Sequence, residues 1–154
     1  MIEPPKIVKT SAQLAAVLRI TVPRDEIRAV MGPGLGELQA AVSAQGIPSA
    51  GPWFTHHLRM DPAVFDFEIG IPVSAPFSAT ERARPGELPA ATVVRSVFHG
   101  DYEGLGSAWQ EVDAWIVTNG HSPGPDLWEV YLTGPESTSD PAEWRTELNK
   151  PIGG

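Results

Sequence analysis

The chain has 154 residues, of which 42% are hydrophobic and 19% charged, which is the size and composition of one globular domain. Its net charge of −8 disfavours direct nucleic-acid binding, which needs lysine and arginine to displace counterions from phosphate. Because it has no cysteine, disulfides, thiolate nucleophiles and cysteine-ligated metals are excluded.

The N-terminus lacks an apolar stretch of the length that a signal peptide needs, and no run of about 18 apolar residues occurs in the chain. We therefore expect a soluble, cytoplasmic protein with no membrane partner.

The first half predicts a strand, a helix and two more strands. Residues 15–22 and 54–60 have strand character, as do residues 64–71, and the helix between the first two strands ends near Gln45. The segment G-P-G-L-G at 32–36 predicts a break in this helix, because glycine and proline are poor helix formers. Residues 73–89 are small, polar and proline-containing, and predict a crossover without regular structure.

The second half repeats this order. Residues 91–98 predict a strand, and residues 103–119 have apolar residues at helical spacing, with Asp101 as N-cap and Gly120 as the stop. Residues 127–133 and 143–148 predict a hairpin.

The two halves also share residues. Segments 61–72 and 140–151 superpose without a gap, five of their twelve positions are identical, and Phe65 matches Trp144. The strand V-L-R-I-T at 17–21 likewise answers V-V-R-S-V at 93–97. An order of elements that occurs twice indicates a duplicated module rather than a solenoid, which needs three or more repeats.

We therefore expect one α+β domain over residues 1–154. Module one spans about 14–72, the crossover 73–89, and module two about 90–152. Each β-α-β-β module is too small to bury its own sheet, so the two should combine into an antiparallel sheet with two main helices on one face.

The stretch P-D-L-W-E-V-Y-L at 125–132 contains a carboxylate in a strand that otherwise looks buried. Strand alternation places Glu129 and Tyr131 on one face and Trp128 on the other, and neither face is polar. Burial disfavours an ionised carboxylate unless a cation or hydrogen-bond donors support it. Glu129 should therefore either pair with an internal cation, such as Arg95 or Arg19, or await a ligand.

The first module has no acid at this place. Its corresponding stretch reads P-W-F-T-H-H-L, and either Phe54 or Thr55 takes the position of Glu129, depending on which aromatic is matched to Trp128. A duplicated scaffold that differs at one central position is what an asymmetric ligand site requires.

Aromatic side chains accompany this carboxylate, either as core or as walls of a ligand cavity. An aromatic cavity with one carboxylate favours flat lipophilic cations through stacking, cation–π contacts and charge pairing. The candidate ligand-binding residues are Glu129, Tyr131, Tyr102, Trp144, Trp109, Phe54, Trp53 and His56.

The histidines do not predict a metal site. His56 and His57 are adjacent, so in a strand they point to opposite faces, and His99 and His121 add no ligand spacing. We expect neither a metal nor another cofactor.

Four segments resemble the GyrI-like small-molecule-binding domain, which forms the effector-binding part of AraC-type and MerR-type multidrug-responsive regulators. They are H-G-D-Y-E-G-L-G at 99–106, W-x-E-V-x-A-W-I at 109–116, W-E-V-Y-L at 128–132 and D-P-A-E-W-R-T-E-L at 140–148. The resemblance covers residues from about 14 to 152.

This resemblance implies two modules related by a pseudo-two-fold axis, with a ligand pocket at their junction. In the family, the glutamate of the E-x-Y strand reaches into that pocket and contacts cationic lipophilic ligands. By motif match this residue is Glu129, with Tyr131 two positions on and with Tyr102 and Trp144 as walls. The regulators carry a DNA-binding domain ahead of this unit, whereas about a dozen residues precede the first predicted strand here, so we expect a stand-alone form.

Three functions stay open, of which the second and the third are what the family resemblance implies. The first is binding of lipophilic, often cationic or aromatic small molecules, for drug or toxin sequestration or for sensing. The second is hydrolysis of strained electrophilic molecules of the cyclopropane type, with Glu129 and Tyr131 as catalytic residues. The third is inhibition of a DNA topoisomerase through a protein contact, and the sequence leaves a protein partner or a homodimer open.

Overall fold

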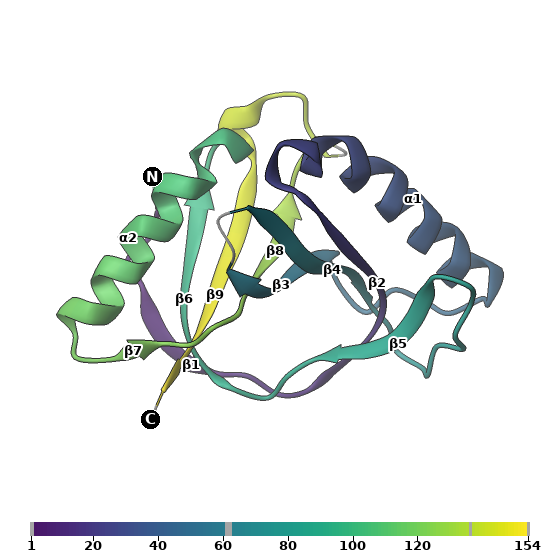
Figure 1. Ribbon diagram of the computed structural model, residues 1–154, viewed down its shortest axis with the longest axis horizontal. Helices are drawn as coiled ribbons and strands as arrows, with labels where there is room; N and C mark the ends of the chain where they lie inside the picture. The colour runs from purple at the N-terminus through teal and green to yellow at the C-terminus, as the bar shows by residue number, and fades with distance from the viewer. Residues whose placement is uncertain (1, 61–62, 136, 154) are drawn as a thin grey trace. The chain divides into compact units, whose positions relative to one another are not determined.

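The computed structural model describes residues 2–60, 63–135 and 137–153. Two compact units make up the chain: one is Ser11–Ala90, and the other joins Met1–Thr10 to Ala91–Gly154. Each unit contains antiparallel strands and one main helix (Figure 1), which confirms the predicted α+β class. No helix in the described ranges is long and apolar enough to cross a bilayer.

In the unit Ser11–Ala90 the strand order is β3-β4-β2-β5, with every neighbouring pair antiparallel. A 3₁₀ turn, η1, leads into the single main helix. The elements are β2 (Gln13–Pro23), η1 (Arg24–Glu26), α1 (Ile27–Ala44), β3 (Phe54–Met60), β4 (Val64–Pro72) and β5 (Ala83–Leu88).

One face of this sheet packs on α1. The alternate residues Leu18 and Ile20 of β2 meet Ile69 of β4, and together they bury Leu38 of the helix. Fully burying such a side chain stabilises the fold by about 1.5–3 kcal/mol, so this face fixes which way each strand is turned. Thr55 of β3 pairs with Ile69 and therefore lies on the α1 face as well.

The break predicted in the first helix at residues 32–36 is wrong, because α1 runs without interruption through Ile27–Ala44. Close packing explains why glycine is found inside the helix. A Cβ on Gly34 would lie 2.8 Å from Ile69 Cδ1 and 3.1 Å from Ile20 Cδ1. Burial against the sheet thus outweighs the helix propensity cost of glycine and proline, about 1 and 3 kcal/mol.

In the other unit the strand order is β1-β6-β9-β8, and β7 pairs with the end of β9. All these pairs are antiparallel. The elements are β1 (Lys6–Lys9), β6 (Thr92–His99), η2 (Tyr102–Gly104), α2 (Leu105–Thr118), β7 (Ser122–Pro123), β8 (Leu127–Thr133), η3 (Pro141–Glu143) and β9 (Arg145–Gly153).

Helix α2 lies along β6 and β9 (Figure 1) and buries one stripe against them. It begins at Leu105, two residues after the predicted start, because the 3₁₀ turn η2 comes first and Asp101 caps that turn; it ends at Thr118, just before the predicted stop at Gly120. The Asp101 carboxylate accepts a hydrogen bond from the Glu103 backbone N–H at 2.9 Å. Gly120 has a φ of 78°, the left-handed conformation that ends helices. The core of this unit comprises Val94, Phe98, Ala108, Val112, Ile116 and Leu148.

Two strands occur where none was predicted. β1 pairs with β6, and β5, inside the predicted crossover 73–89, pairs with β2. Each therefore precedes the first strand of one half but pairs with the first strand of the other half. Both are short and lack clear alternation, and β5 contains Pro85 and Gly86, so only pairing with a sequence-distant strand defines them.

The match between 17–21 and 93–97 is off by two residues. Arg19 stands opposite Glu68, whereas it is Val97, not Arg95, that stands opposite Glu147. The predicted match of Glu68 with Glu147 agrees with the strand pairing. Glu68 stands opposite His56 of β3, and Glu147 stands opposite Val130 of β8. Asp61 and Pro62, which began that match, lie outside the described residues.

Candidate functional site

Glu129 is buried, with 7% of its surface exposed. It lies in β8 opposite Leu148 of β9, a core residue beneath α2, so its side chain is on the α2 face of the sheet. The predicted alternation of this strand is confirmed, and the carboxylate is placed among apolar side chains.

Two neutral donors hold this carboxylate. The Trp109 indole Nε1–H, from α2, donates to Glu129 Oε2 at 2.6 Å, and the Tyr131 hydroxyl donates to Oε1 at 2.7 Å. Hydrogen bonds to a charged group each contribute about 1.5–3 kcal/mol, which offsets part of the cost of burial. Within the described ranges, the carboxylate makes no ion pair.

The internal arginine partners considered for Glu129 are engaged elsewhere. Arg95 donates to Asn149 Oδ1 at 2.7 Å and lies 3.4 Å from Glu147 Oε1, on the sheet face away from α2. Arg19 donates to both carboxylate oxygens of Asp66, at 3.1 and 2.9 Å. The hydrogen bond that Arg19 donates to Asp66 raises the pKa of Arg19 above its ordinary value, so this guanidinium stays charged.

Aromatic side chains extend the site along β8. The Tyr102 ring meets Tyr131 edge-on, with centroids 5.7 Å apart, and lies 5.0 Å from the Trp144 ring. Trp144 is fixed in turn by its indole N–H, which donates to the Thr138 carbonyl at 3.0 Å. The structure thus brings together five of the predicted residues, which we name the Glu129 cluster: Glu129, Tyr131, Trp109, Tyr102 and Trp144.

The other three predicted ligand residues belong to the unit Ser11–Ala90. Phe54 is 1% exposed and its ring covers Gly70, on the sheet face away from α1. His56 follows on that same face, opposite Glu68. Trp53 packs against the core beneath α1.

Strand register resolves which residue of the first module corresponds to Glu129. Thr55 stands opposite Ile69 as Glu129 stands opposite Leu148, so the position belongs to Thr55 and not to Phe54. By the same register His57 corresponds to Tyr131. The acid and the phenol are therefore specific to the second module.

A protein cation covers the first module's counterpart of Trp144. The Arg24 guanidinium carbon lies 4.3 Å from the centroid of Phe65, which is the residue matched to Trp144. In the second module the ring of Tyr102 takes this place. The two modules thus fill equivalent positions with a cation in one and a neutral aromatic in the other.

Thr146 joins the site, although the sequence did not single it out. Its side chain is fully buried opposite Tyr131, and its hydroxyl has no hydrogen-bond partner within the described part of the chain. A signal was available, because the gap-free match of the two halves places Thr146 on Phe67, which is core.

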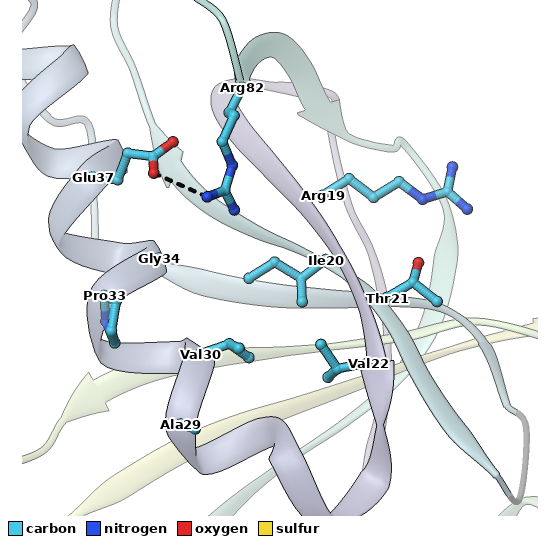
Figure 2. Close-up of a pocket in the computed structure, with 10 residues that line it drawn as sticks. All are labelled: Arg19, Ile20, Thr21, Val22, Ala29, Val30, Pro33, Gly34, Glu37 and Arg82. Atoms are coloured by element: carbon cyan, nitrogen blue, oxygen red, sulfur yellow. Dashed lines mark ion pairs between the residues drawn. The ribbon is translucent and has the colours of Figure 1, made fainter.

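Two hollows on the described surface are lined by residues of the unit Ser11–Ala90, and no member of the Glu129 cluster lines either of them. The larger, about 370 Å³, lies between α1 and β2 (Figure 2). Its cations are already paired, Arg82 with Glu37 at 3.2 Å and Arg19 with Asp66. In Figure 2 the Ile20 side chain points toward the helix while Arg19 points away. The second hollow, about 330 Å³, is bordered by Trp53. No three His, Asp or Glu side chains in the described ranges gather to hold a metal.

Residues 3–152 match the model of the GyrI-like small molecule binding domain. The chain belongs to this family. The crystal structure of the EcmrR C-terminal domain has the same fold, with a TM-score of 0.86 at 22% identity, and the match covers 97% of each chain. The cryo-EM structure of the EcmrR–DNA complex also matches, with a TM-score of 0.85 at 22% identity over 97% of this chain. This chain spans only 57% of the length of the EcmrR chain in that complex.

Two other structures share the GyrI-like fold at lower identity. A hydrolase from Listeria innocua has a TM-score of 0.69 at 13% identity, over 97% of this chain and 91% of that one. SAV2435 bound to tetraphenylphosphonium has a TM-score of 0.68 at 12% identity, over 99% and 95%. None of the curated proteins matches the chain.

Proposed function

We propose that this GyrI-like chain binds lipophilic organic cations at the Glu129 cluster, for sequestration or for sensing. One observation carries the proposal. Glu129 is 7% exposed and is held by two neutral donors, with no ion pair within the described ranges. A ligand that brings a positive charge supplies a counter-charge that none of the described residues supplies.

The energetics favour a cation over a neutral guest. Removing a carboxylate from water costs several kcal/mol, and neutral donors recover only part of this. A desolvated organic cation beside the carboxylate recovers more, because charge pairs interact more strongly at low dielectric. The rings of Tyr102 and Trp144 add stacking or cation–π contact.

Neither hollow described above borders Glu129, and we propose that the ligand enters by displacing a neutral donor of the cluster. The side chain best placed to move is Trp109, which comes from α2 and donates to the carboxylate. A cation that takes over one carboxylate oxygen releases the indole to act as a wall. Binding is thus an exchange of a neutral donor for a charged one.

The proposal predicts a preference for charge among ligands of similar shape. Methyltriphenylphosphonium should bind at least about tenfold more tightly than triphenylphosphine oxide, which keeps the three phenyl rings but is neutral. Calorimetric titration of both compounds measures this ratio. Equal affinities would show that only the rings are recognised and would remove the role assigned to Glu129.

The hydrogen bond from Tyr131 to Glu129 supports a second candidate, hydrolysis of a carbonyl-conjugated cyclopropane. Glu129 would take a proton from water, and the water oxygen would bond to a ring carbon as the strained carbon–carbon bond breaks. The electron pair would move to the conjugated oxygen, which Tyr131 would protonate. Glu129 would then return its proton to Tyr131 across the 2.7 Å contact.

This candidate is tested with Tyr131→Phe. If the chain hydrolyses such a probe, turnover should fall by about 10²–10⁴-fold, the usual contribution of a general acid. Affinity for methyltriphenylphosphonium should change little, because the ring and Glu129 remain. Full turnover in this variant, measured by chromatography of the ring-opened product, would rule out Tyr131 as the acid.

A further inference from the structure

Thr146 carries a buried polar group that the fold leaves unused. Its side chain is 0% exposed and its hydroxyl has no hydrogen-bond partner within the described ranges. An orphan hydroxyl is disfavoured in a folded core, where polar groups are normally paired. The Thr146 hydroxyl thus adds no protein hydrogen bond to the stability of the described structure.

Its position is on the same sheet face as Glu129. Thr146 stands directly opposite Tyr131, two pairs along the ladder from the pairing of Glu129 with Leu148, which returns to the same face of the sheet. Directly opposed side chains have Cβ atoms about 4.5–5.5 Å apart, and diagonal ones are still within reach of each other. Thr146 is therefore the diagonal neighbour of Glu129 on this face, at about 7–8 Å, and the direct neighbour of Tyr131.

The first module shows that the fold does not need a hydroxyl there. The equivalent residue is Phe67, also 0% exposed, and its ring stacks on His57 with centroids 5.2 Å apart. In the second module the smaller Thr146 replaces that ring. Two neighbouring positions differ between the modules as well. Thr55 of the first module corresponds to Glu129 of the second, and His57 corresponds to Tyr131, so three neighbouring positions differ as a group.

We propose that the Thr146 hydroxyl is a second recognition point in the Glu129 site. It forms a hydrogen bond with an oxygen that the ligand carries near its positive centre. The ligand class is then a lipophilic cation with a hydroxyl, ether or carbonyl oxygen, not a purely hydrocarbon cation. This inference rests on the proposed function, because it assumes that the cation contacts Glu129.

The test compares tetraphenylphosphonium with its ortho-, meta- and para-hydroxyphenyl derivatives, which differ by one oxygen. At least one isomer should bind the wild-type chain about 3- to 10-fold more tightly than the parent, the gain from one hydrogen bond. Thr146→Val removes the hydroxyl while keeping a β-branched side chain of similar size. It should abolish that advantage and leave the affinity for the parent unchanged, whereas Thr146→Ser should keep it.

A stability measurement separates this role from a structural one. Because no protein hydrogen bond is lost, the valine variant should unfold at the same or higher urea concentration than wild type. A clearly lower midpoint would mean that the hydroxyl serves the closed fold, and would overturn the proposal. So would an isomer advantage that survives in the valine variant, or no advantage for any isomer.

Those outcomes leave the proposed function standing if tetraphenylphosphonium still binds and its affinity still depends on Glu129. If tetraphenylphosphonium fails to bind the wild-type chain, the proposed function and this inference fail together.

Discussion

Replacing Glu129 by glutamine should weaken tetraphenylphosphonium binding by about 1–3 kcal/mol, the range for a charge-assisted contact. Glutamine keeps the size and shape of the side chain and removes the charge. Its oxygen can still accept from Trp109, and its amide can donate to the Tyr131 hydroxyl, which turns to accept. The fold should therefore survive the change, and calorimetry measures the affinity.

Glu147→Gln is the matched control. It removes one negative charge from the same unit, but Glu147 is on β9 facing away from α2, where it lies 3.4 Å from Arg95. Both variants have the same net charge, so long-range attraction of a cation is equal in the two. If both lose the same affinity, the cation responds to overall charge and not to Glu129. If Glu129→Gln unfolds the chain, the carboxylate is structural.

A substitution in the other unit, Gly70→Ala, should destabilise the fold by about 2–3 kcal/mol or prevent folding. A Cβ on Gly70 would overlap Cζ of the Phe54 ring, far inside contact distance. The Phe54 ring is 1% exposed and has little room to move aside. Urea unfolding followed by circular dichroism measures the loss.

Gly36→Ala serves as the control, because a Cβ there meets nothing within 4 Å and alanine favours the helix. It should leave stability unchanged or raise it slightly. Adding Phe54→Leu to Gly70→Ala should restore part of the lost stability, because the shorter side chain relieves the overlap. Normal stability of Gly70→Ala alone would contradict this packing.

This packing bears on the role assigned to Phe54 from the sequence. A ring pressed on Gly70 contributes to the sheet face away from α1, whereas Thr55, its neighbour, lies on the α1 face. The ligand-binding roles predicted for Phe54, Trp53 and His56 remain predictions. Those of the Glu129 cluster also remain predictions, although its members contact one another.

The burial of Glu129 could be predicted from the sequence because strand alternation is a local property. Apolar and aromatic neighbours on both faces of β8 indicate burial, and burial makes a carboxylate conspicuous. Motif spacing likewise predicted the cap at Asp101 and the stop at Gly120. The family assignment, which rested on short motifs, is confirmed over residues 3–152.

Other features depend on contacts that the sequence does not express. The helix α1 passes through its glycines and proline because Gly34 packs closely on β2 and β4. β1 and β5 are defined only by pairing with strands that are distant in the sequence. β1 pairs with β6, in the other half of the chain, and β5 pairs with β2, from which α1 and the β3–β4 hairpin separate it. The hydrogen bond from Trp109 to Glu129 was also out of reach, since Trp109 is 20 residues away on another element.

The measurement that tests the central claim most directly is a crystal structure of the chain with tetraphenylphosphonium. The account predicts that the phosphonium lies beside the Glu129 carboxylate, with Trp109 no longer donating to it and with Tyr102 or Trp144 against a phenyl ring. A cation seated in the hollow between α1 and β2, with the bonds from Trp109 and Tyr131 to Glu129 intact, would contradict it.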